Sequence, residues 1–313
     1  QMQSEGGKLV EKTVIQFCNF YQKKYSPKEF PQPSVVAAIC NILVSHNKLS
    51  QMHLRGPDGS NNSYLGVISN EALLSDVYFQ SLLNKKLSYL IYGFKFIYED
   101  YKKFVLPIEF TDQDDNISLG TCFLYHDGIA TARHCIEGAK QIGIQGISSE
   151  ALQNAQFEIH ENPSMDLLFI RLKNKPQESI FFSANGEVLD EIMTLGYPKI
   201  AGYHNFLTAE NASVSSRFTA SVGQVSSNAE DIWIREKLFL ITAKIKGGNS
   251  GGPVISKDGS IIGIAVNMSQ GEGNYDDLGY GTVIPVSFLN ELIDSKQKKY
   301  LIVGDINFVN FEI

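Results

Sequence analysis

The sequence predicts a mostly β protein in which a pair of antiparallel barrels follows a small helical domain. From Val105 to about Val286, short β-branched runs alternate with Gly, Asn and Ser turns and show almost no helical period. That pattern is typical of antiparallel strands. Before Val105 the apolar residues instead recur at steps of three and four, the period of a helix with one buried face. A length of 313 residues agrees with more than one domain.

The first part of the chain predicts two helices and a polar connection. Apolar residues at helical spacing mark residues 8–24 as an amphipathic helix. Prolines interrupt the chain after it, and Ser34 then offers an N-cap for a second helix over residues 35–44. Residues 45–63 are polar and contain a Gly-Pro-Asp-Gly turn signal, so we expect a loop there.

Two further helical segments complete the predicted N-terminal domain. Asn70 is a good N-cap for a helix over residues 71–84. An apolar, mostly aromatic stripe then recurs at alternating steps of three and four through residues 87–104. We therefore assign residues 1–104 to a helical domain with its own core, and expect its last helix to adjoin the β domain because no flexible linker follows.

One segment of the β region, Lys246–Val254, has the composition of a functional loop, and we call it the serine loop. It places glycines and a proline around Ser250, between two strand-like apolar runs. Glycine lets the backbone adopt positive φ and approach a ligand closely. Such a loop can direct N–H groups at one point, as an oxyanion hole requires. By itself, the same composition also fits a hairpin turn with an incidental serine.

The chain also supplies a base and a carboxylate for that serine. A serine hydroxyl is a weak nucleophile unless a base accepts its proton and a carboxylate orients the base. His134 follows a hairpin-like stretch, and Asp166 opens a buried-strand pattern, so the order along the chain is His, Asp, Ser. Three further histidines lack such a strand context and are weaker candidates: His126, His160 and His204.

Together these motifs resemble the trypsin-like, chymotrypsin-fold serine proteases. The histidine of that family lies in T-A-A-H-C, which here reads T-A-R-H-C over residues 131–135, and its serine lies in G-[DN]-S-G-G-P. With an asparagine before Ser250, the serine motif is most similar to that of the HtrA-type branch. The resemblance implies two antiparallel six-stranded barrels over residues 105–295 and a C-terminal extension over residues 296–313. It shows no PDZ-like module after them, unlike many HtrA-type proteases.

The resemblance also implies a role for each residue of the site. Ser250 is expected to attack the scissile carbonyl, His134 to act as general base and acid, and Asp166 to hold the histidine tautomer. The backbone N–H groups of Gly248 and Ser250 are expected to form the oxyanion hole. The resulting expectation is a serine endopeptidase acting on protein or peptide substrates, with neither cofactor nor metal. The alternative is a catalytically silent binding or scaffold protein on the same fold.

By the family's pattern, five residues line the pocket for the residue before the cut: Lys244, Val266, Asn267, Met268 and Tyr280. No carboxylate stands at the expected pocket base, which argues against a preference for Arg or Lys. Two preferences remain open. A small apolar residue matches the HtrA-type pattern, and an acidic residue would follow if the Lys244 ammonium points into the pocket.

Charge and composition limit the partners. The net charge is −7, and it divides into 12 basic against 8 acidic side chains in residues 1–104 and 15 against 26 in residues 105–313. An acidic chain argues against nucleic-acid binding, and no apolar stretch reaches the length of a membrane span. The polar first residues favour a cytoplasmic location. A regulatory protein partner of residues 1–104 is expected by loose analogy with bacterial stress or defence proteases.

Overall fold

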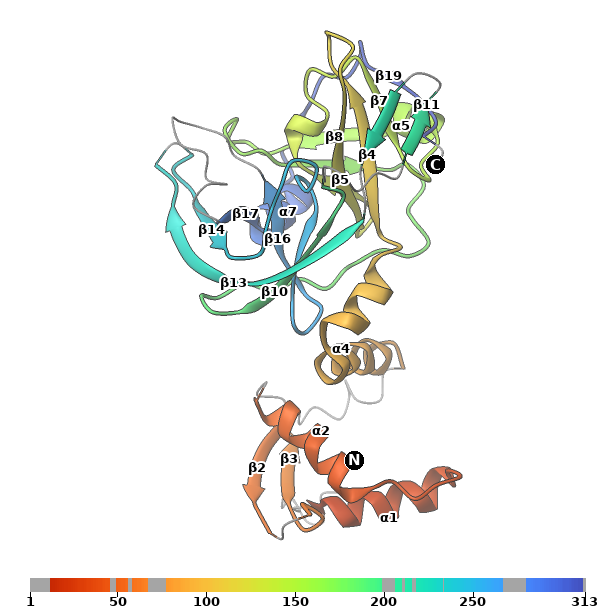
Figure 1. The fold of residues 1–313 in the computed structure, drawn as a ribbon, viewed down its shortest axis with the longest axis vertical. Coiled ribbons are helices and arrows are strands. Elements are labelled where there is room, and N and C mark those ends of the chain that lie inside the picture. Colours follow the sequence, from red (N-terminus) through yellow and green to blue (C-terminus); the bar gives the residue numbers. More distant parts are fainter. Residues whose placement is uncertain are drawn as a thin grey trace. The chain divides into compact units, whose positions relative to one another are not determined.

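The structure is a computed structural model that describes residues 12–45, 49–55, 58–66, 77–198, 206–209, 212–215, 218–232, 234–266 and 280–311 (Figure 1). The chain divides into two compact units, residues 1–93 and residues 94–313. No helix within the described ranges is long and apolar enough to cross a membrane.

The first unit contains helices and a small sheet. Its helices are α1 (Val14–Tyr25) and α2 (Pro33–Ser45), and its antiparallel strands are β1 (Lys12–Thr13), β2 (Leu49–His53) and β3 (Ser63–Gly66), in the order β1-β3-β2. Thr13 caps α1, since its hydroxyl accepts the N–H of Gln16 while the Gln16 side chain accepts the N–H of Thr13. The two expected helices are present. The sheet differs from the expectation for residues 45–63, where only a loop was predicted.

The unit boundary falls inside the long helical segment α4 (Val77–Tyr101). The expected cap and first turn of the third helix, residues 70–76, lie outside the described residues. The backbone breaks at Gly93, whose φ of 70° and ψ of −164° are not helical. Beyond the break, Ile97 and Tyr101 are buried, and the Tyr101 hydroxyl donates to the carbonyl of Gly259 at 2.5 Å. The last two turns of α4 therefore belong to the second unit, although the sequence assigned them to residues 1–104.

The second unit begins with one large sheet. Six of its strands come from the first half of the unit: β4 (Val105–Thr111), β5 (Ile117–Tyr125), β6 (Gly128–Thr131), β7 (Gln141–Ile144), β8 (Gln156–Ile159) and β9 (Leu168–Arg171). Two short strands of the C-terminal segment, β18 (Lys299–Tyr300) and β19 (Asn307–Phe308), pair with its edges, giving the order β18-β8-β9-β6-β5-β4-β7-β19. Because these strands occupy both edges, the described sheet is open rather than the closed six-stranded barrel that was predicted.

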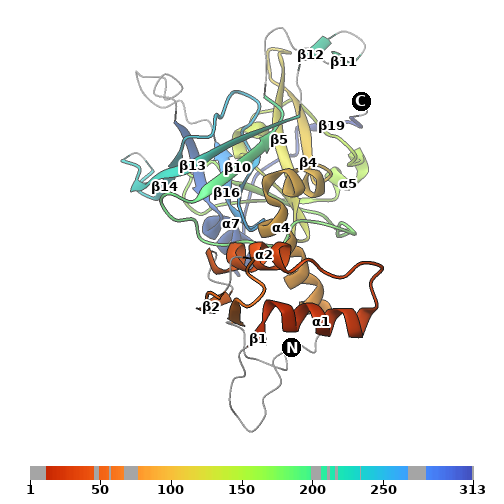
Figure 2. The ribbon, with the colours of Figure 1, turned by 60° about the horizontal axis from the view of Figure 1, so that its bottom comes forward.

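Six further strands of the second unit close into a barrel, as predicted. They are β10 (Glu191–Gly196), β13 (Thr219–Glu230), β14 (Lys237–Ile241), β15 (Pro253–Ser256), β16 (Ile261–Val266) and β17 (Gly281–Pro285), in the closed order β10-β13-β14-β17-β16-β15 (Figure 2). Its interior is aliphatic and aromatic, and includes Ile192, Val225, Phe239 and Val254. The structure is therefore mostly β, in agreement with the predicted fold class.

Short elements connect these strands. They are the 3-10 turn η1 (Arg133–Cys135), the helix α5 (Ser149–Gln153), the strand pair β11 (Phe206–Ala209) and β12 (Ala212–Ser215), and the closing helix α7 (Val286–Asp294). All four cysteines carry free thiols, and Cys18, Cys122 and Cys135 are buried.

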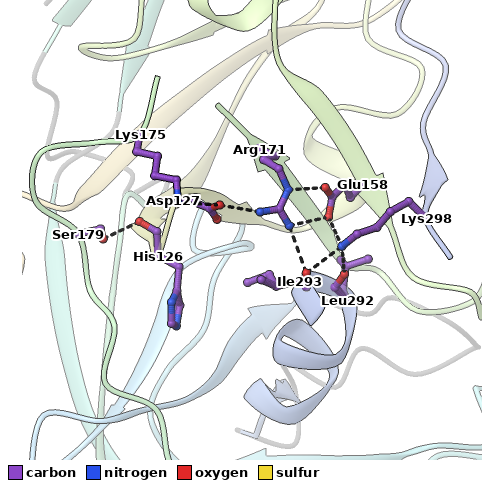
Figure 3. Close-up of polar contacts among 9 residues, drawn as sticks. All are labelled: His126, Asp127, Glu158, Arg171, Lys175, Ser179, Leu292, Ile293 and Lys298. Carbon is purple, nitrogen blue, oxygen red and sulfur yellow. Dashed lines mark hydrogen bonds and ion pairs between the residues drawn. The ribbon is translucent and has the colours of Figure 1, made fainter. Parts of the chain in front are cut away.

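A charged cluster fixes the end of α7 to the first sheet (Figure 3). Glu158, whose side chain is 1% exposed, accepts hydrogen bonds from both Arg171 and Lys298. Arg171 also pairs with Asp127 at 2.7 Å. The Lys298 ammonium donates in addition to the carbonyls of Leu292 (2.6 Å) and Ile293 (2.9 Å), which α7 leaves without helical partners. The cluster therefore neutralises the buried carboxylate of Glu158 and supplies hydrogen-bond donors to the last carbonyls of α7.

Candidate active site

The pairing of β6 with β9 brings His134 and Asp166 together at one end of these two neighbouring strands of the first sheet. Strand β6 ends at Thr131 and β9 begins at Leu168, and these two residues are directly paired. The chain that leaves β6 and the chain that enters β9 therefore meet. The carboxylate of Asp166 accepts from the main-chain N–H of His134 at 2.9 Å, and its other oxygen lies 2.6 Å from the ring Nδ1 of His134. Both carboxylate oxygens are thus engaged by one histidine.

This pair shifts the pKa values of both side chains. Burial, the largest single effect, would lower the pKa of His134, but the hydrogen bonds and electrostatic interactions with Asp166 and Cys135 together outweigh it, and the pKa is raised above its usual value near 6.5. Burial, the largest single effect, would raise the pKa of Asp166, but the hydrogen bonds from His134 and the charges of His134 and Arg133 together lower it. The arrangement favours a protonated imidazole beside a charged carboxylate. A serine protease needs that state after the nucleophile has lost its proton.

The serine loop lies between β14 and β15 of the barrel and reaches the first sheet. The N–H of Thr121, on β5, donates to the carbonyl of Ser250 at 2.9 Å. Gly251 has a φ of 87°, and a methyl group there would lie 2.3 Å from the Thr131 hydroxyl and 2.9 Å from the N–H nitrogen of Ala132. Only glycine permits this approach. The backbone next to Ser250 therefore packs against the segment that leads into His134.

A positive φ of 99° and a close backbone contact mark Gly248. A methyl group at this position would lie 2.3 Å from the carbonyl oxygen of Tyr197. The Gly248 carbonyl accepts the hydroxyl of Thr121 at 2.6 Å, and the next N–H, that of Asn249, closes a turn onto Lys246 at 2.9 Å. The described residues provide no acceptor for the N–H of Gly248. A backbone donor in this position is a candidate for the oxyanion hole expected from the sequence.

The residues expected to line the substrate pocket have different surroundings. Val266 is fully buried at the end of β16, paired with Thr282, and Tyr280 is 42% exposed just before β17. Lys244 is exposed, and its backbone N–H donates to the hydroxyl of Ser221 at 3.0 Å. Asn267 and Met268 lie outside the described residues, as does the weaker base candidate His204.

A cavity of about 530 Å³ lies elsewhere in the second unit. Its walls come from β13, β14 and the start of α7, and include Asn228, Arg235, Phe239 and Phe288. None of His134, Asp166 and Ser250 contributes to it. The described residues contain no group of three or more His, Cys, Asp or Glu side chains that could hold a metal ion.

Sequence reasoning missed Thr121. Its side chain is fully buried and donates to the Gly248 carbonyl, while its main chain donates to the Ser250 carbonyl. In the sequence it reads as an ordinary β-branched strand residue. The available signal is local: Gly120 and Thr121 stand directly before the apolar run Cys122-Phe123-Leu124, shortly before His134.

Comparisons with known proteins agree on one region. Residues 120–264 match the model of the Trypsin-like peptidase domain. A probable periplasmic serine endoprotease, DegP-like, from Chlamydia pneumoniae is 29% identical over 182 residues, covering 56% of this chain and 33% of that protein. The periplasmic serine endoprotease DegP of Escherichia coli K12 is 25% identical over 167 residues, covering 52% and 32%. The chain spans about a third of the length of the curated relatives it matches.

Among solved structures, the Rv3671c protease of M. tuberculosis in its active form aligns over 67% of this chain and 88% of its own length. The sequence identity is 19% and the TM-score is 0.49.

The relatives contradict the expected cytoplasmic location. The DegP proteins that the chain matches are periplasmic by name. The cytoplasmic expectation depended only on the polar composition of the first residues, and that composition does not determine where a folded protease domain works.

Proposed function

Since the chain carries a trypsin-fold, HtrA-like serine protease domain, we propose that it is a serine endopeptidase that hydrolyses peptide bonds of protein substrates. Ser250 is the nucleophile of this proposal, His134 the general base and acid, and Asp166 the residue that orients the histidine. The supporting observation is the double hydrogen bond of Asp166 to His134, at 2.9 and 2.6 Å, beside a serine loop packed against the same segment.

In the proposed reaction, Ser250 Oγ attacks the scissile carbonyl carbon while His134 accepts the hydroxyl proton. The imidazolium is stabilised by Asp166, and the N–H groups of Gly248 and Ser250 donate to the oxyanion. The intermediate then collapses, the C–N bond breaks, and His134 gives its proton to the departing amine. Water then attacks the acyl carbonyl carbon while His134 accepts one of its protons. The C–O bond to Ser250 breaks, His134 returns the proton to Ser250 Oγ, and the carboxylic acid product leaves.

Labelling with a fluorophosphonate probe tests this proposal, because the probe phosphonylates a serine that an adjacent base has activated. We expect the native chain to be labelled, with mass spectrometry placing the adduct on Ser250. Labelling should be absent in Ser250→Ala and His134→Ala. Adduct formation that persists in Ser250→Ala refutes the assignment. A native chain that is labelled under no condition supports the catalytically silent binding protein instead.

We also propose that the enzyme acts outside the cytoplasm, as the names of its DegP-like relatives suggest. A part in a bacterial stress or defence response fits a protease of this kind. The same labelling assay on cell fractions tests the location: the labelled chain should be found in the periplasmic or external fraction. Recovery only from the cytoplasm contradicts the proposal.

A last part of the proposal assigns regulation by a protein partner to residues 1–104. Charge supports it, since this segment carries an excess of four positive charges next to an acidic protease part. A truncated chain should begin at Phe94, because Tyr101 and Ile97 are packed in the second unit and must be retained. We expect peptide cleavage by the full chain and by residues 94–313 to differ at low salt and to converge at high salt. Equal rates in both conditions refute regulation through charge.

A further inference from the structure

The side chain of Thr121 connects the serine loop to the rest of the protease unit. It is fully buried, on β5, 127 residues before Gly248 in the sequence. Its hydroxyl lies 2.6 Å from the carbonyl oxygen of Gly248 and 2.9 Å from the N–H nitrogen of Tyr197. Its main-chain N–H donates to the carbonyl of Ser250 at 2.9 Å. One residue thus contacts the loop on both sides of Asn249.

The direction of these hydrogen bonds is determined by their partners. The N–H of Tyr197 can only donate, so the Thr121 oxygen accepts from it. The hydroxyl proton is left for the Gly248 carbonyl, which can only accept. The Thr121 hydroxyl therefore donates in one direction only, to the Gly248 carbonyl. Because the hydroxyl is buried, water cannot replace the Gly248 carbonyl as its acceptor.

The two carbonyls that Thr121 holds belong to alternate peptide units of the loop. The Gly248 carbonyl lies in the peptide after the N–H of Gly248, and the Ser250 carbonyl lies in the peptide after the N–H of Ser250. A peptide unit is planar, so fixing these two carbonyls fixes the units that also contain the N–H groups of Asn249 and Gly251. The units that contain the N–H groups of Gly248 and Ser250 adjoin the fixed units through one shared Cα, so only φ and ψ at these junctions remain to set their directions. Holding both carbonyls restricts the directions in which the two N–H groups point.

Resting on the proposed function, we propose that Thr121 is a positioning residue for the oxyanion hole, acting through the carbonyls of Gly248 and Ser250 on the two N–H donors. Oxyanion donors are effective because they are oriented before the charge develops, so a loose loop loses rate at the chemical step. A positioning role of this kind should therefore affect kcat more than KM.

Tyr197, which orients the threonine hydroxyl, is itself held by aromatic contacts. Its ring centroid lies 5.2 Å from that of Phe218, which in turn lies 5.5 Å from that of Tyr98 in the second half of α4. Its hydroxyl donates to the carbonyl of Val105 at 3.3 Å, and burial raises its pKa to about 12, so it remains a neutral donor. The support behind Thr121 is therefore a packed layer rather than a mobile loop.

The experiment measures kcat and KM for an internally quenched peptide with valine before the cut, using the full chain. Thr121→Val removes the hydroxyl and keeps the β-branched shape, Thr121→Ala removes it with no risk of overpacking, and Thr121→Ser retains it. Thr194→Val is the matched control, since Thr194 is also buried and donates its hydroxyl to a backbone carbonyl, that of Ser221, at 3.3 Å. Thermal unfolding of each variant confirms that it is folded.

We expect Thr121→Val and Thr121→Ala to lower kcat by roughly ten- to a hundredfold with KM within about twofold, since loss of a whole oxyanion donor costs about 10²–10³. Thr121→Ser and Thr194→Val should stay within about threefold of the native kcat. Native kcat in folded Thr121→Val or Thr121→Ala overturns the inference about Thr121 and leaves the proposed function standing. A fall of kcat in Thr121→Ser as large as in Thr121→Val has the same meaning. A native chain without turnover overturns the proposed function and this inference with it.

Discussion

Replacing Asp166 with asparagine should disable the proposed base by forcing the wrong histidine tautomer. The main-chain N–H of His134 lies 2.9 Å from one carboxylate oxygen, and it can only donate. The amide oxygen of the substituted side chain must therefore face that N–H, which turns its NH₂ group toward Nδ1. Nδ1, now 2.6 Å from a donor instead of a carboxylate, must accept, and the ring proton moves to Nε2.

An imidazole with its proton on Nε2 cannot accept the proton of Ser250. We therefore expect turnover to fall by about 10⁴, the scale of the same change in chymotrypsin-like enzymes, which corresponds to about 5.5 kcal/mol of transition-state stabilisation. The pKa of His134 should also fall, because the carboxylate that raises it is gone. The base acts when neutral, so native activity should rise with pH through a value above 6.5, and the residual activity of Asp166→Asn should rise at lower pH.

The assay is kcat/KM against pH for the native chain, Asp166→Asn and a control, Asp112→Asn. Asp112 is also a carboxylate that accepts backbone N–H groups, from Asp114 and Asn116, but it lies in an exposed turn. The control should keep the native rate and profile. Turnover of the folded Asp166→Asn variant within tenfold of the native value would mean that another group orients His134, and the reasoning above would fail.

Three other substitutions give sharp outcomes. Lys298→Met removes three hydrogen bonds from a side chain that is 17% exposed; their loss should lower the free energy of unfolding by about 3 kcal/mol and the melting temperature by roughly 6–12 °C. The control Lys175→Met breaks an ion pair whose lysine is 76% exposed, and it should change the melting temperature by less than about 2 °C. Equal shifts in the two variants refute the account of the cluster. Gly251→Ala places a methyl group 2.1 Å from the Thr121 carbonyl oxygen and should lower turnover more than about a hundredfold. In the control Gly304→Ala the added methyl group has no heavy atom within 4 Å, and turnover should not change. A Gly251→Ala variant with native turnover contradicts the loop geometry. Lys244→Ala should leave a preference for small apolar residues before the cut unchanged, and a native preference for Glu or Asp that the variant loses would refute the choice of an apolar pocket.

The sequence predicted best what depends on local backbone geometry. The serine loop needs glycine at position 251, where φ is 87° and a side chain has no room, so its composition is visible without a structure. Apart from the twelve-residue β13, the strands of the closed barrel have four to six residues and are rich in apolar side chains, and this pattern of short strands identifies the fold class.

The sequence could not show what depends on long-range pairing. Thr121 acquires its role from Gly248, 127 residues away, and a threonine in a strand gives no sign of such a partner. The apolar stripe through α4 continues without a gap across Gly93, so its period could not reveal that the two halves belong to different compact units. Strand β1 has only two residues, too few for any alternation to appear in the first unit.

The most direct measurement for the central claim is proteome-wide profiling of the new N-termini that appear when a bacterial lysate is incubated with the native chain or with Ser250→Ala. The account predicts a set of cleavage sites with a shared small apolar residue before the cut, all of them absent from the Ser250→Ala sample. Cleavage of the same sites by folded Ser250→Ala, or no new N-termini from a native chain that the fluorophosphonate probe labels, would contradict it.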